Sequence, residues 1–143
     1  MQAGSTPTST DSALLAELAL SRGDLVQEWG WDDDVDDAFR AALDSALGEE
    51  LLTEEDQEAV DAVILWWRAE DGDVTDLTDT LMDAQATLDA GPLWLFTPRK
   101  GRDGHVDPSD VQEAAPTAGL HVTTGSGASA DWSAVRLVQK RGG

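Results

Sequence analysis

The hydrophobic and polar residues of the chain follow two different patterns. Short runs that are apolar at almost every position occur at residues 62–67 and 92–96. Such runs are typical of strands that are buried on both faces of a sheet. Residues 35–47 and 74–88 instead carry apolar side chains three and four positions apart, which predicts amphipathic helices. The chain therefore alternates predicted strands with predicted helices.

Weaker signals complete the order of elements. Residues 12–21 predict a short helix, residues 25–29 a strand and residues 50–52 a very short strand. Asp107 followed by Pro108 predicts the start of another helix, which Pro116 and Gly119 are expected to end. The last two strands are predicted at residues 120–124 and 135–138, with residues 125–127 in the turn between them.

This order predicts a single α/β domain over residues 12–140, with a disordered tail at 1–11 and a flexible C-terminus at 141–143. Alternating strands and helices favour a mainly parallel, Rossmann-like sheet with helices on both faces. The C-terminal antiparallel hairpin distinguishes this order from flavodoxin-like folds, which finish with a helix. Such a hairpin is typical of the class I methyltransferase-like fold, here in a truncated form.

Composition and charge exclude several classes of function. The 143 residues include 29 acidic and 9 basic side chains, a formal net charge of −20, and no cysteine. Nucleic-acid phosphates and anionic membranes repel such a chain, so neither is an expected partner. Without thiols there is no disulfide, cysteine nucleophile or thiolate zinc site. Because the pattern contains no signal peptide or membrane span, we expect a cytoplasmic protein; the sequence does not predict its oligomeric state.

The charge is distributed unevenly along the chain. Residues 1–98 hold 24 acids and 3 bases, whereas residues 99–143 hold 5 acids and 6 bases. Three of these bases, Arg99, Lys100 and Arg102, lie within four positions and are followed by His105. They predict a site for a small anionic ligand or an acidic protein partner. Alternatively, they pair with the acids of residues 32–34 and 70–73 across the strand ends.

The loop after the first predicted strand lacks the glycines of a cofactor loop. Loops that bind dinucleotides or S-adenosylmethionine use several glycines so that the backbone can approach the ligand, whereas this loop has only Gly30. Trp31 would obstruct that approach, and the acids would repel phosphate. We therefore expect no cofactor, and we expect the acids to favour the N-terminus of the following helix. Asp32, Asp34 and Asp36 match only part of a calcium-loop pattern, so no metal is expected.

Ligands bind outside the carboxyl ends of the strands in sheets of this kind, so the loops at 30–34, 68–73 and 97–107 should converge. The candidate ligand- or partner-binding residues in these loops are Trp31, Asp32, Arg68, Arg99, Lys100, Arg102 and His105. No nucleophile elbow occurs and no triad can be argued, so no catalytic residue is predicted. The tryptophans at 29, 66 and 94 are expected in the core. Those at 31, 67 and 132 belong either to the core or to a pocket rim.

Several longer motifs occur in order along the chain. They include QEWGWD at 27–32, LWWR at 65–68, EDGD at 70–73, TPR at 97–99 and EAAPTAGL at 113–120. In these motifs the chain resembles the actinobacterial family catalogued as domain of unknown function 3052. The resemblance implies an actinobacterial, cytoplasmic protein but supplies no activity. The family's gene neighbourhood, close to genes for the pyruvate dehydrogenase E1 component and a peroxiredoxin, implies a link to central metabolism.

These observations together predict a non-catalytic binding or regulatory module that uses the strand-end face of the sheet. The alternative is a small methyltransferase or a nucleotide-using enzyme. In that alternative Glu28 or Asp32 contacts ribose hydroxyls, and His105 acts as a general base.

Overall fold

Five strands form one mixed sheet in the part of the chain that the structure describes. This computed structural model describes residues 9–126 and 131–139. The strands are β1 (Val26–Trp29), β2 (Ala62–Trp66), β3 (Leu93–Pro98), β4 (Leu120–Ser126) and β5 (Trp132–Gln139), in the spatial order β1-β2-β3-β5-β4. The first three strands are parallel, and β5 runs antiparallel to both β3 and β4. The predicted parallel sheet with a closing hairpin is confirmed.

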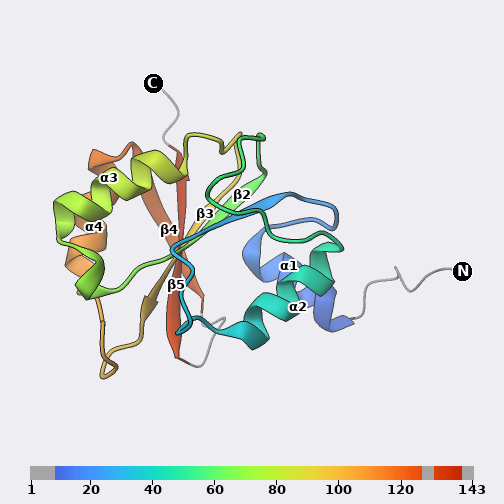
Figure 1. Ribbon diagram of the computed structural model, residues 1–143, viewed down its shortest axis with the longest axis horizontal. Helices are drawn as coiled ribbons and strands as arrows, with labels where there is room; N and C mark the ends of the chain where they lie inside the picture. The colour runs from blue at the N-terminus through green and yellow to red at the C-terminus, as the bar shows by residue number, and fades with distance from the viewer. Residues whose placement is uncertain (1–8, 127–130, 140–143) are drawn as a thin grey trace, which may run out of the picture.

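Helices cover both faces of this sheet (Figure 1). Helices α1 (Ser9–Leu18) and α2 (Asp37–Leu47) lie on one face, and α3 (Val74–Ala84) and α4 (Pro108–Thr117) lie on the other. The side chains of Asp36, Asp73 and Asp107 cap α2, α3 and α4 by accepting backbone N–H groups of the first turn. No helix among the described residues is long and apolar enough to cross a membrane.

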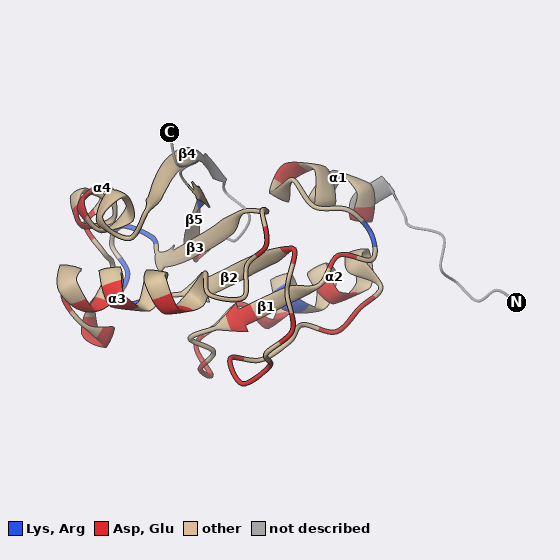
Figure 2. Cartoon of the chain, turned by 90° about the horizontal axis from the view of Figure 1, so that it is seen from above, with Lys and Arg blue, Asp and Glu red and all other residues tan. Residues whose placement is uncertain are grey.

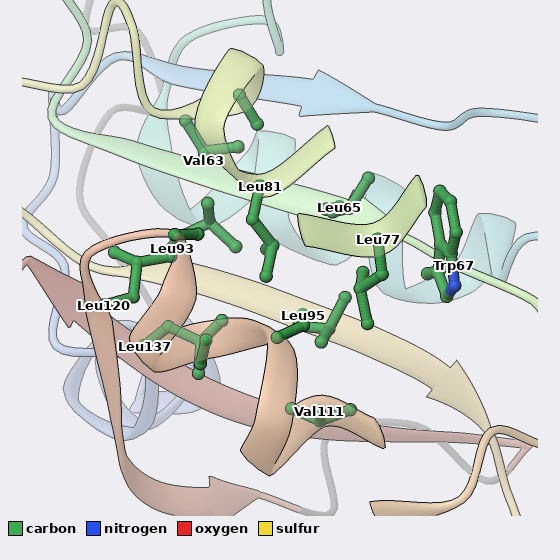
Figure 3. Close-up of a cluster of buried hydrophobic side chains, with 14 of the residues drawn as sticks. Val63, Leu65, Trp67, Leu77, Leu81, Leu93, Leu95, Val111, Leu120 and Leu137 are labelled. Atoms are coloured by element: carbon green, nitrogen blue, oxygen red, sulfur yellow. The ribbon is translucent and has the colours of Figure 1, made fainter. Parts of the chain in front are cut away.

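Each face of the sheet has its own hydrophobic core. Val63, Leu65 and Leu95 pack against α3 and α4 on one face (Figure 3). On the other face, next to α1 and α2, the ring centroids of Trp66 and Phe96 are 4.6 Å apart. Because β2 and β3 are buried on both faces, both strands are apolar at nearly every position, which explains why the sequence predicts them well.

Some element boundaries differ from the sequence prediction. Helix α1 begins at Ser9, inside the predicted tail, while residues 1–8 and the predicted C-terminus at 141–143 lie outside the described residues. Helix α3 ends at Ala84, because the chain then turns so that Leu88 forms a bridge with Val60. The expected turn at 125–127 is wrong at Gly125 and Ser126, which belong to β4 and pair with Val135 and Ala134 of β5. Residue 127 lies outside the described residues.

The outer edge of β1 is covered by the segment at residues 50–56. The backbone N–H of Leu52 donates to the carbonyl of Val26 at 2.8 Å, and the N–H of Glu28 donates to the carbonyl of Leu52 at 2.8 Å. The predicted short strand is therefore a single bridge. The buried Gln27 amide donates to the carbonyls of Thr53 and Asp56, so this segment is held against β1.

Candidate binding site at the strand ends

Arg68 lies two residues beyond the end of β2 and joins the carboxyl ends of β1 and β2. Its buried guanidinium donates to the carbonyl oxygens of Gly30 at 2.7 Å and Trp66 at 3.2 Å. It also donates two hydrogen bonds to Asp34, one of them from Nε to Oδ2 at 2.9 Å. A carboxylate oxygen of Asp71 lies 3.5 Å from Nη1. Arg68 therefore fixes the acidic loop after β1 against both strand ends.

These contacts shift the pKa of both partners of the ion pair. The hydrogen bond from Arg68 holds the pKa of Asp34 below its usual value, although burial opposes this. Burial would lower the pKa of Arg68, but the hydrogen bond and charge of Asp34 and the charge of Asp71 raise it overall. The guanidinium also lies over the indole of Trp132, 5.3 Å from the ring centroid, which adds a cation–π contact.

The acids of the loop before α2 have different hydrogen-bond partners. Asp36 caps this helix by accepting the N–H of Phe39 at 2.9 Å, whereas Asp34 binds Arg68. Asp32 instead accepts the backbone N–H of Asp33 within the loop. The sequence could not separate these roles, because consecutive acids all lie near the start of the same helix.

Glu28 and Gly30 are both occupied by protein contacts. The carboxylate of Glu28 is 7% exposed and accepts two hydrogen bonds from Arg40, at 2.6 and 2.8 Å, and one from the Trp66 indole at 2.9 Å. A Cβ atom added at Gly30 would lie 2.3 Å from the carbonyl oxygen of Trp66, and φ of this glycine is +75°. Gly30 therefore allows β1 and β2 to approach each other closely. It does not provide room for a ligand on that side.

A cavity of about 360 Å³ opens at the ends of β1 and β2, beside α3. We call it the strand-end cavity. It is bordered by Trp29, Trp31, Trp66 and Trp67, although the ring of Trp66 packs on the opposite face of the sheet, and its charged lining consists of Asp32, Glu54, Arg68, Asp71 and Asp83. Trp31 is 55% exposed and belongs to the cavity lining. Three predicted site residues, Trp31, Asp32 and Arg68, therefore meet at one place.

Trp67 is the buried residue of this lining that carries an unused hydrogen-bond donor. It is 7% exposed, and Figure 3 shows its indole at the end of the hydrophobic cluster, beside Leu77. The indole N–H groups of Trp29 and Trp66 each donate to a side-chain oxygen. The N–H of Trp67 has no acceptor among the described residues. A buried donor in this state normally bonds to water or to a ligand.

The predicted basic loop lies at the same edge of the sheet but does not line the strand-end cavity. Arg102 pairs with Asp131 at 3.6 Å, and the backbone N–H of Arg99 donates to the carbonyl of Asp131 at 3.0 Å. Lys100 is exposed. Arg68 forms the close ion pairs with Asp34 and Asp71, whereas Arg102 pairs with Asp131 and acts on Asp34 only through its charge, which helps to lower the pKa of that carboxyl group.

His105 belongs to a separate cavity of about 240 Å³ between the N-termini of α3 and α4. Its Nδ1 lies 2.9 Å from the carbonyl oxygen of Pro98, so this nitrogen carries the proton and donates. The capping aspartates Asp73 and Asp107 line the same cavity. Hydrogen bonds from the backbone N–H groups at the start of each helix lower the pKa of both carboxyl groups. His105 therefore does not join Trp31 and Arg68.

Sequence reasoning missed two charged residues of the strand-end cavity. Glu54 comes from the segment that covers β1, and Asp83 comes from α3. Neither follows a strand, so the rule that ligands bind at strand ends does not select them. Within residues 9–126 and 131–139, no group of three or more histidine, cysteine, aspartate or glutamate side chains is arranged to hold a metal ion.

Comparison with known sequences identifies a family. The profile described as "Protein of unknown function (DUF3052)" matches residues 15–141. Uncharacterized protein Rv2239c of Mycobacterium tuberculosis H37Rv is 49% identical, over 98% of this chain and 88% of its own length. Uncharacterized protein Mb2263c of Mycobacterium bovis gives the same values of 49%, 98% and 88%. The names of these relatives state no activity.

Comparison with solved structures identifies the fold. Magnesium protoporphyrin IX methyltransferase from Synechocystis PCC 6803, solved with bound SAM, matches with a TM-score of 0.59 and 12% identity, over 92% of this chain and 78% of its own. Mitomycin 7-O-methyltransferase MmcR matches with a TM-score of 0.64 and 12% identity, over 91% of this chain and 53% of its own. A SAM-dependent methyltransferase from Aquifex aeolicus matches with a TM-score of 0.56 and 15% identity, over 90% and 89%. The class I methyltransferase-like fold is confirmed, and at such identities the likeness concerns the fold alone.

Proposed function

The chain belongs to the DUF3052 family, and its mycobacterial relatives make it an actinobacterial protein; from this premise we propose that it is a non-catalytic binding module. Its ligand occupies the strand-end cavity. The observation that carries the proposal is the position of Arg68, whose donors are taken up by Gly30, Trp66 and Asp34. Arg68 thus closes the loop after β1 while an open, tryptophan-lined space remains beside it.

The start of α2 supports binding over a cofactor-dependent reaction. A helix N-terminus binds phosphate or carboxylate when its N–H groups are free. Here the side chain of Asp36 already accepts one of them, and Asp37 adds a second carboxylate in the first turn. An anionic cofactor group placed there would meet like charge. The carboxylate of Glu28 accepts hydrogen bonds from Arg40 and Trp66, and Gly30 lies against the carbonyl of Trp66. These contacts also favour binding over a cofactor-dependent reaction.

The strand-end cavity has the volume of a small-molecule site. Such sites are concave and have a volume of roughly 300–1,000 Å³, with polar groups that orient the ligand. The cavity of about 360 Å³ lies in this range, and its lining is more polar than is usual, with five charged side chains beside its tryptophans. The unused N–H of Trp67 supplies a buried donor in the same lining.

The test uses the full chain with ¹⁵N-labelled tryptophan and a panel of metabolite-sized fragments that differ in charge. We expect fragments that bind to shift the indole signals of Trp31 and Trp67, and we expect these shifts to be lost in Trp31→Ala. Met82→Ala is the matched control, because Met82 is 52% exposed and lies outside the cavity lining. Fragments that bind equally well to Trp31→Ala, or a panel without any binder, would overturn the proposal.

A small methyltransferase or nucleotide-using enzyme is the alternative function. The fold likeness favours it, and so does Asp32, which is exposed in the cavity lining where it can accept hydroxyl groups. Calorimetry with S-adenosylmethionine and with ATP separates the two functions. Micromolar affinity for either compound, lost in Asp32→Asn, would replace the binding module by the enzyme.

The basic loop carries a prediction of its own. Arg99, Lys100 and Arg102 predict an acidic protein partner or a small anionic ligand, and the exposure of Lys100 supports a contact there. Replacing all three by glutamine should abolish capture of the partner in a pull-down. Unchanged capture of every partner would show that the basic loop is not part of the binding site. The link to central metabolism and the cytoplasmic location also stay predictions.

A further inference from the structure

Resting on the proposed function, we infer that the strand-end cavity selects an organic cation, an amine or a quaternary ammonium group, that also carries an oxygen. The face of a tryptophan ring attracts a cation through its electron-rich centre, and several rings around one space bind ammonium groups more strongly than water does. Trp29 and Trp31 approach the cavity from the end of β1, and Trp67 approaches it from the end of β2. The three tryptophans therefore come from two neighbouring strands and border one space, and Trp67 also borders the cavity at His105.

The charges around this cavity favour the same ligand. Four carboxylates, from Asp32, Glu54, Asp71 and Asp83, lie in its lining with a single base, Arg68. Asp34 and Asp71 already pair with this base. An anion would therefore meet carboxylates without a free positive charge, whereas Asp32, Glu54 and Asp83 would attract a cation. Figure 2 shows the acidic segments gathered around β1 and α3.

Trp67 adds an independent indication of a ligand. Its side chain is 7% exposed, it lines the cavity, and its indole N–H has no acceptor among the residues that the structure describes. An ammonium group cannot accept this hydrogen bond, but a hydroxyl or carbonyl oxygen on the same molecule can. The combination of indole faces, carboxylates and one unused donor therefore matches a cation that bears an oxygen a few bonds away.

Trp29 and the segment that contains Glu54 are held in place by protein contacts. Gln27 is fully buried, donates to the carbonyls of Thr53 and Asp56, and accepts the indole N–H of Trp29 at 3.0 Å. One side chain thereby fixes both an aromatic wall and the segment that contains Glu54. Ligands bind more tightly to groups that are already positioned, because less conformational freedom is lost on binding.

Choline and its neutral isostere 3,3-dimethyl-1-butanol test the inference directly. Both carry the same hydroxyl and nearly the same shape, and only choline is charged. With the indole signals as the readout, we expect choline to bind at least about ten-fold more tightly than the isostere. Raising NaCl from about 0.02 to about 0.5 M should weaken choline binding several-fold, because salt screens the carboxylates.

Variants of Trp31 locate the effect in the strand-end cavity. Trp31→Ala should weaken choline binding about five-fold or more, Trp31→Phe should retain part of it, and Met82→Ala should leave it unchanged. Equal affinity for choline and the isostere would overturn the cation selectivity. Choline affinity that is the same in Trp31→Ala would overturn the site. Failure of the proposed binding function would instead be seen with the fragment panel, where fragments of any charge would bind equally well to the wild type and to Trp31→Ala.

Discussion

Replacing Arg68 with methionine tests how far the strand ends depend on one guanidinium. The substitution keeps an apolar stem of similar length but removes the donors to the carbonyls of Gly30 and Trp66. Each of these acceptors loses roughly 1 kcal/mol of net hydrogen bonding. Asp34 is 45% exposed, so its ion pair adds only about 1 kcal/mol. We therefore expect the free energy of unfolding to fall by about 3 kcal/mol.

Equilibrium unfolding in urea, followed by tryptophan fluorescence, measures this loss. Arg68→Lys should lose about half as much, roughly 1.5 kcal/mol, because an ammonium group cannot form the two-bond contact with Asp34. Arg102→Met is the matched control, since Arg102 and Asp131 are 44% and 65% exposed. Its loss should stay below about 0.5 kcal/mol. An equal loss in Arg68→Met and Arg102→Met would refute the assigned role of Arg68.

Further predictions concern the same end of the sheet. Gly30→Ala should lower the free energy of unfolding by about 3 kcal/mol or more, because the added Cβ would lie 2.3 Å from the Trp66 carbonyl oxygen. Gly101→Ala should lower it by only about 1 kcal/mol, because a Cβ there meets nothing within 4 Å. Equal melting temperatures of the two variants would contradict this. Asp34→Asn should be less stable than the wild type at pH 7, because the lowered pKa of Asp34 in the native state stabilises the folded protein while the carboxyl group is ionised. The difference in stability should shrink as the pH falls below the ordinary pKa of 3.8, because the carboxyl group then becomes protonated. A difference in urea unfolding that stays constant down to pH 2.5 would contradict that assignment. Glu28→Gln should cost about 2 kcal/mol in urea unfolding, because Arg40 loses its charged partner, and an unchanged midpoint would be the opposing result.

The fold was predictable from the sequence where local signals are strong. β2 and β3 are apolar at nearly every position because both of their faces are buried. Asp107 and Pro108 mark the start of α4 through capping and a fixed φ, both of which depend only on neighbouring residues. The end of α3 was less predictable. It depends on the bridge between Val60 and Leu88, which joins distant parts of the chain.

The candidate site was predictable only in part. Trp31, Asp32 and Arg68 meet because each lies just beyond the end of a parallel strand, and topology alone brings such residues together. The ion pair between Arg68 and Asp34 could not be predicted in the same way, since it depends on the direction of two side chains. The same holds for Asp83, whose place on α3 matters only once the helix is packed on the sheet.

The central claim is that this methyltransferase-like fold serves binding and not methyl transfer. Calorimetric titration of S-adenosylmethionine into the full chain tests it most directly. The account predicts no saturable heat with a dissociation constant below about 100 μM, a free energy of roughly −5.5 kcal/mol. A micromolar dissociation constant that is weakened in Asp32→Asn and unchanged in Met82→Ala would contradict it.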